Sequence, residues 1–181
     1  MQVKPLPLQG LLLVTPKVFG DDRGWFFESY HYPRFAELGV KIPFVQDNHS
    51  CSSQGTLRGM HFQTDPGQAK LVRCILGQVW DVAVDIRPES STFGQWHAEI
   101  LSSENHSQLY IPVGFAHGFL VLSEKAEVQY KCSAIYDAKT EAGFMWNDPD
   151  VKIDWPLKGL KPVLSERDKN NPSFKAFFKL S

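Results

Sequence analysis

The sequence contains few cysteines and has almost no excess of charge of either sign. Its three cysteines, Cys51, Cys74 and Cys132, lie far apart without a Cys-x-x-Cys pair, so neither a disulfide framework nor a zinc site is indicated. We expect buried thiols in a reducing compartment. The formal net charge of -1 at pH 7 supplies no basic face for a nucleic-acid backbone, and we expect no nucleic-acid partner. A small phosphate-bearing ligand needs only a few converging basic side chains.

Long apolar runs are also missing. No run approaches the ~20 apolar residues of a membrane span. Near the start, the run Leu11-Leu12-Leu13-Val14 covers only four residues, which is shorter than the apolar core of a signal peptide. The sequence therefore predicts a cytoplasmic protein with no membrane association.

What the chain does contain is typical of one folded domain. It has 181 residues, of which 43% are hydrophobic and 22% charged, with no biased segment that would resist packing. This length supports one substantial core and is too short for two comfortable ones. We expect residues 1–181 to form a single domain.

Short strands separated by turns dominate the pattern. The clearest strand is 79–87, where Trp80, Val82 and Val84 alternate with Asp81 and Ala83. Further strands are predicted over residues 11–18, 95–101, 108–111, 118–122 and 127–136, with a hairpin-like turn at 20–24. A short helix begins near Pro33 and ends near Gly39, and Ser165 and Asp168 suit the start of another. Without a βαβ rhythm, an all-β jelly roll accounts for this pattern best.

Two segments resemble the paired motifs of the cupin superfamily, whose jelly-roll barrels bring both motifs to one cavity. They are Gly55-x5-His61-x-Gln63 and Pro112-x-Gly114-x2-His117. Metal-binding cupins place a second histidine where this chain has Gln63, and Lys70 falls near the position of the expected carboxylate. A divalent cation would lack ligands and meet repulsion. We therefore expect a metal-free cavity.

A cavity without a metal has to work by proton transfer and fixed charge. The imidazole of His61 suits a general base, and Arg58 and Lys70 can hold an oxyanion or a phosphate. Strict strand alternation would place Arg58 and His61 on opposite faces. A bulge at Gly59 would turn both side chains into the cavity.

The resemblance then becomes specific to one family. Runs that match dTDP-4-dehydrorhamnose 3,5-epimerases extend over nearly the whole chain, at residues 19–24, 44–50, 57–63, 70–73, 82–87, 111–119, 146–149 and 164–168. The resemblance implies a cupin-type jelly roll, that is, a double-stranded β-helix, with an N-terminal strand extension and short helices near the C-terminal end. It implies no cofactor.

The resemblance also implies a reaction. The family epimerises dTDP-4-keto-6-deoxyglucose at C3 and C5, two carbons whose protons are acidified by the C4 ketone. His61 matches the base, Asp168 the carboxylate that orients it, and Tyr130 the acid on the opposite face of the ring. Lys70 would stabilise the enolate.

The family's substrate-holding residues map onto Arg23, Glu28, Gln46, Asp47, Asn48, Arg58, His117, Glu141 and Arg167. Either Phe26 or Tyr136 would stack on thymine. Taken alone, His117 would also fit a turn-capping role in its Pro-Gly segment. The family resemblance implies a homodimer, and the apolar stretch 11–14 would pair across its interface as an edge strand.

Three alternatives stay open at this stage. An epimerase that inverts only C3 or only C5 would share these motifs. A metal-dependent cupin isomerase or dioxygenase would require stoichiometric metal. A non-catalytic sugar-nucleotide-binding barrel would keep the arginines yet dispense with His61 and Tyr130.

Overall fold

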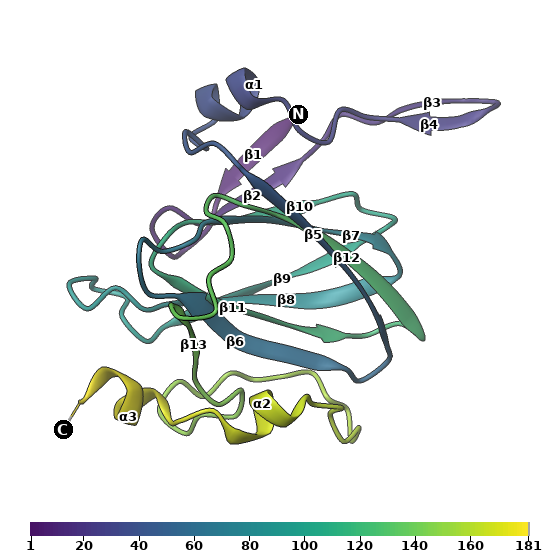
Figure 1. The fold of residues 1–181 in the computed structure, drawn as a ribbon. Coiled ribbons are helices and arrows are strands. Elements are labelled where there is room, and N and C mark those ends of the chain that lie inside the picture. The colour runs from purple at the N-terminus through teal and green to yellow at the C-terminus, as the bar shows by residue number, and fades with distance from the viewer. Residues whose placement is uncertain (181) are drawn as a thin grey trace.

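The computed structural model describes residues 1–180, which fold around two antiparallel sheets that face each other as a barrel (Figure 1). The six-stranded sheet has the order β1 (Gln2–Pro5), β2 (Leu12–Thr15), β10 (Gln108–Ile111), β7 (Lys70–Leu76), β12 (Lys125–Cys132), β5 (Gln46–Ser53). The five-stranded sheet has the order β13 (Glu141–Gly143), β6 (Leu57–Gln63), β11 (Phe115–Val121), β8 (Gln78–Asp85), β9 (Trp96–Ser102). The predicted all-β double sheet is confirmed.

Three short helices and one separate hairpin complete the chain. The helices are α1 (Tyr32–Glu37), α2 (Glu166–Asn170) and α3 (Phe174–Phe178), and the hairpin joins β3 (Phe19–Asp21) to β4 (Gly24–Phe26). The hairpin projects away from the barrel, whereas α2 and α3 lie beneath β6 at the opposite end of the molecule (Figure 1). Among the described residues, none of the helices is long and apolar enough to cross a membrane.

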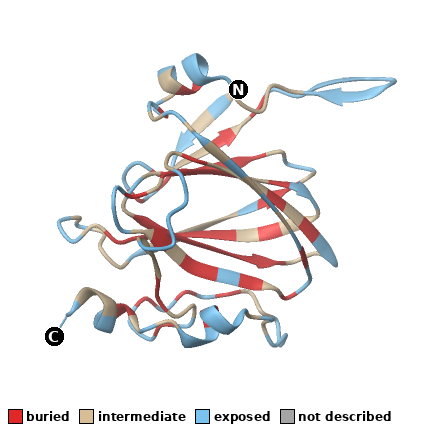
Figure 2. Cartoon of the chain, viewed as in Figure 1, coloured by how far each residue is buried: buried red, intermediate tan, exposed pale blue. Residues whose placement is uncertain are grey.

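Side-chain alternation along β8 divides the apolar core into layers. Val79 and Ala83 pack inside the barrel, while Val82 and Val84 point outward against the C-terminal segment, in a cluster that includes Trp155. Both faces of β8 are thus covered, which is why the strand is almost wholly buried (Figure 2). The C-terminal segment is therefore held by an apolar layer of its own. Burial of apolar surface in this layer stabilises the fold by about 25 cal/mol per Å².

The helix signals in the sequence are confirmed. His31 caps α1 by accepting from the backbone N–H of Arg34, and Gly39 follows the helix end with a φ of +104°. Ser165 caps α2 by accepting from the N–H of Asp168, so the predicted start of the second helix is also right.

Several strand boundaries differ from the predicted ones. β11 begins at Phe115 rather than at 118, because all its residues are buried and no alternation marks its start. β12 ends at Cys132 rather than at 136, since the chain leaves the sheet there. The stretch 11–14 is not a free edge, because β1 and β10 pair with β2 on either side. The sequence patterns also missed β1, β13 and α3.

Candidate active site

Side chains from both sheets converge on a cavity of about 110 Å³ at one end of the barrel. Its lining includes Asn48, His61, Lys70, Tyr130, Tyr136 and Glu141. A pocket for a drug-sized ligand is typically about 300–1,000 Å³. The cavity is therefore large enough for part of a sugar nucleotide, and the remainder of such a molecule would lie outside its mouth.

His61 on β6 forms a close pair with Asp168 on α2. The Nε2 atom of His61 lies 2.5 Å from Oδ1 of Asp168, and the Asp168 side chain is only 2% exposed. Burial opposes ionisation of this carboxyl, but hydrogen bonds with His61 and Ser165 outweigh burial and lower the pKa of Asp168. The pair couples a partly exposed imidazole to a buried anion, an arrangement that fixes the tautomer and orientation of the ring.

A bulge at Gly59 brings Arg58 to the same face of β6 as His61. His61 pairs with His117 on β11, but Arg58 pairs with Phe119, so three steps on β6 correspond to two on β11. Gly59 has a φ of +134°, and a Cβ atom there would approach the Cα of Gly118 to 2.6 Å. The predicted bulge is confirmed, and only glycine fits this conformation and close approach.

Arg58 reaches from β6 across to β5. Its Nη2 and Nε atoms donate to Oγ of Ser52, at 3.1 and 3.3 Å. Much of the Arg58 side chain stays exposed, and a guanidinium held this way can still pair with a phosphate.

Lys70 and Tyr130 enter the cavity from the six-stranded sheet, opposite His61. The Nζ of Lys70 lies 5.8 Å from the centroid of the Tyr130 ring. Burial lowers the pKa of Lys70, and the nearby carboxylates of Asp81 and Glu141 oppose this effect. Burial raises the pKa of Tyr130, so the phenol keeps its proton at neutral pH. The cavity thus holds a histidine on one wall and a protonated phenol on the other.

Beside His61, on the neighbouring strand, lies a second histidine–carboxylate pair. Nε2 of His117 on β11 is 3.0 Å from both carboxylate oxygens of Asp81 on β8, and both side chains are buried. Burial lowers the pKa of His117, although Asp81 acts in the opposite direction. His117 lies within a strand and not in a turn, so the turn-capping alternative is wrong.

The rim of the cavity carries a polar network. Glu141 on β13 pairs with Nη1 of Arg167 at 2.5 Å and accepts from the hydroxyl of Tyr136 at 2.7 Å. On β5, Gln46 donates to Asn48 and accepts from the backbone N–H of Tyr136. Tyr136, one of the two aromatics considered for base stacking, therefore lies at the mouth.

Comparison with known proteins agrees with this geometry. Residues 5–176 match the family model described as dTDP-4-dehydrorhamnose 3,5-epimerase. A protein of that name from Pseudomonas aeruginosa is 53% identical over 175 residues, covering 96% of each chain. The chain belongs to the dTDP-4-dehydrorhamnose 3,5-epimerase family.

Solved structures support the same assignment for the fold. The epimerase of that name from Elizabethkingia anophelis superposes with a TM-score of 0.93 at 48% identity, covering 97% of each chain. A dTDP-6-deoxy-D-glucose-3,5-epimerase from Legionella pneumophila, in complex with dTDP-4-keto-L-rhamnose, gives 0.92 at 46% identity, covering 95% of this chain and 92% of that one. The cupin-type jelly roll expected for this epimerase family is confirmed.

Three residues matched to the epimerase family's substrate contacts lie away from the cavity. Asp47 is on the opposite face of β5 from Asn48 and pairs with Lys131 at 3.0 Å. Glu28 pairs with Arg34 at 2.9 Å, outside the barrel. The third, Arg23, belongs to the projecting hairpin.

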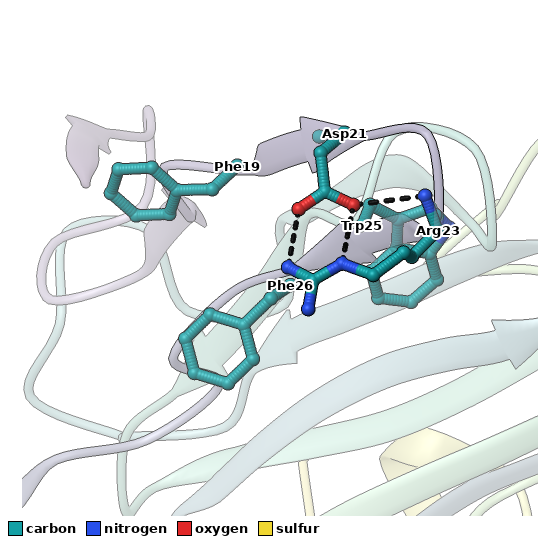
Figure 3. Close-up of a pocket in the computed structure, with 7 residues that line it drawn as sticks. Phe19, Asp21, Arg23, Trp25 and Phe26 are labelled. Carbon is teal, nitrogen blue, oxygen red and sulfur yellow. Dashed lines mark hydrogen bonds and ion pairs between the residues drawn. The ribbon is translucent and has the colours of Figure 1, made fainter.

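Arg23 folds back onto Asp21 within that hairpin, and the rings of Phe19 and Phe26 extend from it (Figure 3). Phe26 is 69% exposed. Of the two aromatics considered for thymine stacking, Tyr136 lines the epimerase cavity, whereas Phe26 lies with Arg23 on the projecting hairpin.

Sequence reasoning missed two carboxylate contacts in this epimerase. Asp81 stands among apolar residues in an alternating strand, which was a signal that it faces a polar partner inside the barrel. Ser165 was recognised as a helix cap, but its contact with the Asp168 carboxylate gave no sequence signal.

Metal-binding cupins have a histidine at the position of Gln63, whose side-chain amide here is hydrogen-bonded to the segment before β13. Its Nε2 donates to the carbonyl of Asp137 at 2.8 Å and to the hydroxyl of Thr140 at 3.2 Å. Among residues 1–180, no group of three or more His, Cys, Asp or Glu side chains is arranged to hold a metal ion.

Proposed function

We propose that this chain is an isomerase that inverts C3 and C5 of dTDP-4-keto-6-deoxyglucose, giving dTDP-4-keto-L-rhamnose for dTDP-L-rhamnose biosynthesis, by proton transfer between its own side chains and the sugar. One observation carries the proposal: His61 and Tyr130 line the same cavity from opposite sheets. Inversion at carbon requires a base on one face of the ring and an acid on the other. Family membership supplies the substrate class.

His61 acts as the base. Its imidazole takes a proton from the carbon next to the C4 ketone, and the electrons of the broken C–H bond move onto the C4 oxygen. The buried Asp168 carboxylate, 2.5 Å away, stabilises the imidazolium that forms. A positioned base of this kind contributes roughly 10²–10⁴-fold to the rate.

Lys70 stabilises the enolate. Its ammonium lies beside Tyr130 in the same cavity, and it can donate a hydrogen bond to the negatively charged C4 oxygen. Because burial lowers its pKa, Lys70 holds its proton less tightly and shares it more readily with that oxygen. By comparison with a single oxyanion-hole donor, this contact contributes about 2.7–4 kcal/mol.

Tyr130 completes the inversion. Its phenol, kept protonated by burial, gives a proton to the carbon from the face opposite His61. The enzyme then holds an imidazolium and a phenolate, and exchange of one proton with solvent resets both groups. A second cycle at the other carbon completes the reaction.

The rim residues suit the rest of the substrate. Arg58 and Arg167 offer guanidinium groups for a diphosphate, which guanidinium can bind with two parallel hydrogen bonds. The exposed ring of Tyr136 at the mouth suits stacking on thymine. His117, Gln46, Asn48 and Glu141 lie within or beside the cavity, where they can contact the sugar.

We also propose that the working form is a homodimer in which the hairpin reaches the partner's cavity. Phe19, Trp25 and Phe26 are 55%, 61% and 69% exposed, which is unusual for three neighbouring large aromatics. Arg23 and Glu28 lie far from the cavity of their own chain. A second copy would cover the aromatic hairpin and bring these residues to a substrate.

The three cysteines are all free thiols. Cys74 and Cys132 are buried, and burial raises the pKa of each to about 11, so both stay protonated and unreactive. Free thiols in a chain of this size suit a reducing compartment, and we place the reaction in the cytoplasm.

Proton exchange tests the proposal. In D₂O, the wild-type protein should incorporate deuterium at both C3 and C5 of the sugar, and His61→Asn should lose exchange at both by roughly 10²-fold or more. NMR of the recovered sugar nucleotide measures each position separately. Normal exchange by the His61→Asn protein would exclude His61 as the base, and wild-type exchange at one carbon only would identify a single-carbon epimerase.

A further inference from the structure

Both oxygens of the buried Asp168 carboxylate have a side-chain partner. Oδ1 faces Nε2 of His61, and Oδ2 accepts a hydrogen bond from the hydroxyl of Ser165 at 2.9 Å. The same hydroxyl accepts from the backbone N–H of Asp168 at 3.1 Å. Ser165 therefore contacts its helix and the catalytic carboxylate at once.

The hydrogen bond from the Ser165 hydroxyl affects the orientation of the Asp168 carboxylate. A carboxylate that is 2% exposed has almost no water to satisfy an oxygen left bare. If Oδ2 lost its donor, the carboxyl group would rotate or move to find another, and Oδ1 would leave its position against His61. The Ser165 contact opposes that rotation and keeps the carboxylate in line with the imidazole.

We propose that Ser165 is a positioning residue for catalysis, whose hydroxyl holds the Asp168 carboxylate against His61. The chain of contacts runs from Ser165 through Asp168 to the imidazole, and Ser165 itself is not on the cavity wall. This inference rests on the proposed function, because it assigns Ser165 an effect only through the His61–Asp168 pair.

The chain offers a matched control in Ser173. Ser173 caps α3 as Ser165 caps α2: its backbone is extended, and its hydroxyl accepts from the N–H three residues on, that of Ala176, at 3.2 Å. No carboxylate contacts the Ser173 hydroxyl among the described hydrogen bonds. Ser173→Ala thus removes a helix cap without touching the catalytic pair.

The experiment measures kcat, dTDP affinity and the melting temperature for Ser165→Ala, Ser165→Gly, Ser165→Thr and Ser173→Ala. Glycine is a tolerable cap without a hydroxyl, and it keeps the test valid if the alanine variant does not fold. We expect Ser165→Ala and Ser165→Gly to lower kcat by roughly 10- to 100-fold, since a hydrogen bond to a charged group is lost. The dissociation constant for dTDP should stay unchanged, and Ser165→Thr should restore most of kcat.

Other outcomes overturn the proposal. If both hydroxyl-free variants keep kcat within about 3-fold of Ser173→Ala, Ser165 is only a helix cap. A change of that size is smaller than the loss of one hydrogen bond to a charged group would cause. If Ser165→Thr is as slow as Ser165→Ala, the hydroxyl is not the responsible group. His61→Asn separates this result from a failure of the proposed function. An inactive His61→Asn beside a fully active Ser165→Gly would reject the positioning role alone.

Discussion

At the scale of single residues, the same local motif occurs twice in this chain with different burial. Asp21 and Asp85 each accept from the backbone N–H, Nε and Nη2 of the arginine two positions later. Asp21 lies on the exposed hairpin, whereas Asp85 is 0% exposed and also accepts from Ser90 and Thr92. Burial decides which of the two motifs stabilises the fold.

This difference predicts a pH-dependent effect on stability. Burial opposes ionisation of Asp85, but its hydrogen bonds, led by those from Arg87, outweigh it and lower its pKa. Its stabilisation is therefore fully present above the unfolded-state pKa of ~3.9 and is lost as pH falls toward the lower folded-state pKa. We expect Asp85→Asn to lower the free energy of unfolding by roughly 3 kcal/mol at pH 7.

Urea unfolding of Asp85→Asn and Asp21→Asn between pH 3 and 7 measures the effect. The wild-type curve should fall at the acid end, and Asp85→Asn should flatten that fall. The exposed Asp21→Asn control should follow the wild type throughout. Equal losses for the two variants would contradict the dependence on burial.

Tyr130 allows a second test at the residue scale. Without its phenol, His61 still removes a proton and returns it to the same face, so Tyr130→Phe should exchange deuterium with little inversion. We expect epimerisation to fall by roughly 10²-fold or more, with dTDP affinity preserved. NMR that resolves both exchange and product configuration makes the measurement.

Tyr110→Phe is the matched control, because Tyr110 is a buried tyrosine on β10 outside the cavity. It should epimerise as the wild type does. Full inversion by Tyr130→Phe would assign the acid to another residue.

At the scale of elements, the bulge in β6 turns Arg58 and His61 to the same face of the strand. Gly59 makes it possible, since its φ is positive and Gly118 of β11 lies directly against it. Gly24 in the hairpin has a similar φ of +127°, but nothing lies within 4 Å of its missing side chain. Alanine in place of Gly24 would therefore cause backbone strain alone, whereas alanine in place of Gly59 would add a steric clash.

We expect Gly24→Ala to cost about 1–3 kcal/mol, the usual range for a side chain held in this backbone region. Gly59→Ala should cost several kcal/mol more and should also abolish activity, because the alanine methyl would push β6 away from β11 and misplace Arg58 and His61. Thermal unfolding and kcat of the two variants test this. Equal destabilisation would contradict the close approach of the two strands.

At the scale of the whole molecule, the cavity is assembled from three parts of the chain. The five-stranded sheet supplies His61, the six-stranded sheet supplies Lys70 and Tyr130, and the C-terminal segment supplies Asp168, which pairs with His61. The hairpin that carries Arg23 lies at the other end of the molecule (Figure 1). If Arg23 contacts a substrate, that substrate lies in a second copy.

Mixed dimers test this arrangement. Arg23→Ala and His61→Asn should each be nearly inactive alone, yet a dimer with one of each would contain one cavity with a wild-type His61 and a wild-type partner Arg23. Random reassociation of equal amounts should restore about a quarter of wild-type activity. Light scattering before and after mixing confirms the dimer, and no recovery would show that Arg23 does not act across an interface.

Much of the local structure was predictable because it depends on neighbouring residues. The alternation in β8 predicted a strand, the two glycines at 20–24 a hairpin, and Ser165 a helix cap. The bulge at Gly59 was also predictable, because Arg58 and His61 have an odd spacing and can share one face of a strand only if a bulge separates them. The short strand β13 carries no such signal, since it exists only through its pairing with β6.

The sequence by itself determined the element types and the residue chemistry of the cavity, because turns, alternation and capping act over a few residues. Only the tertiary structure decided which of these residues meet. His61 and Asp168 are separated by 107 residues in the sequence, and packing of the C-terminal segment against β8 brings them together. The tertiary structure also decided that Asp47, Glu28 and Arg23 lie elsewhere. Asp47 faces away from Asn48 on β5, and Glu28 and Arg23 belong to segments outside the barrel.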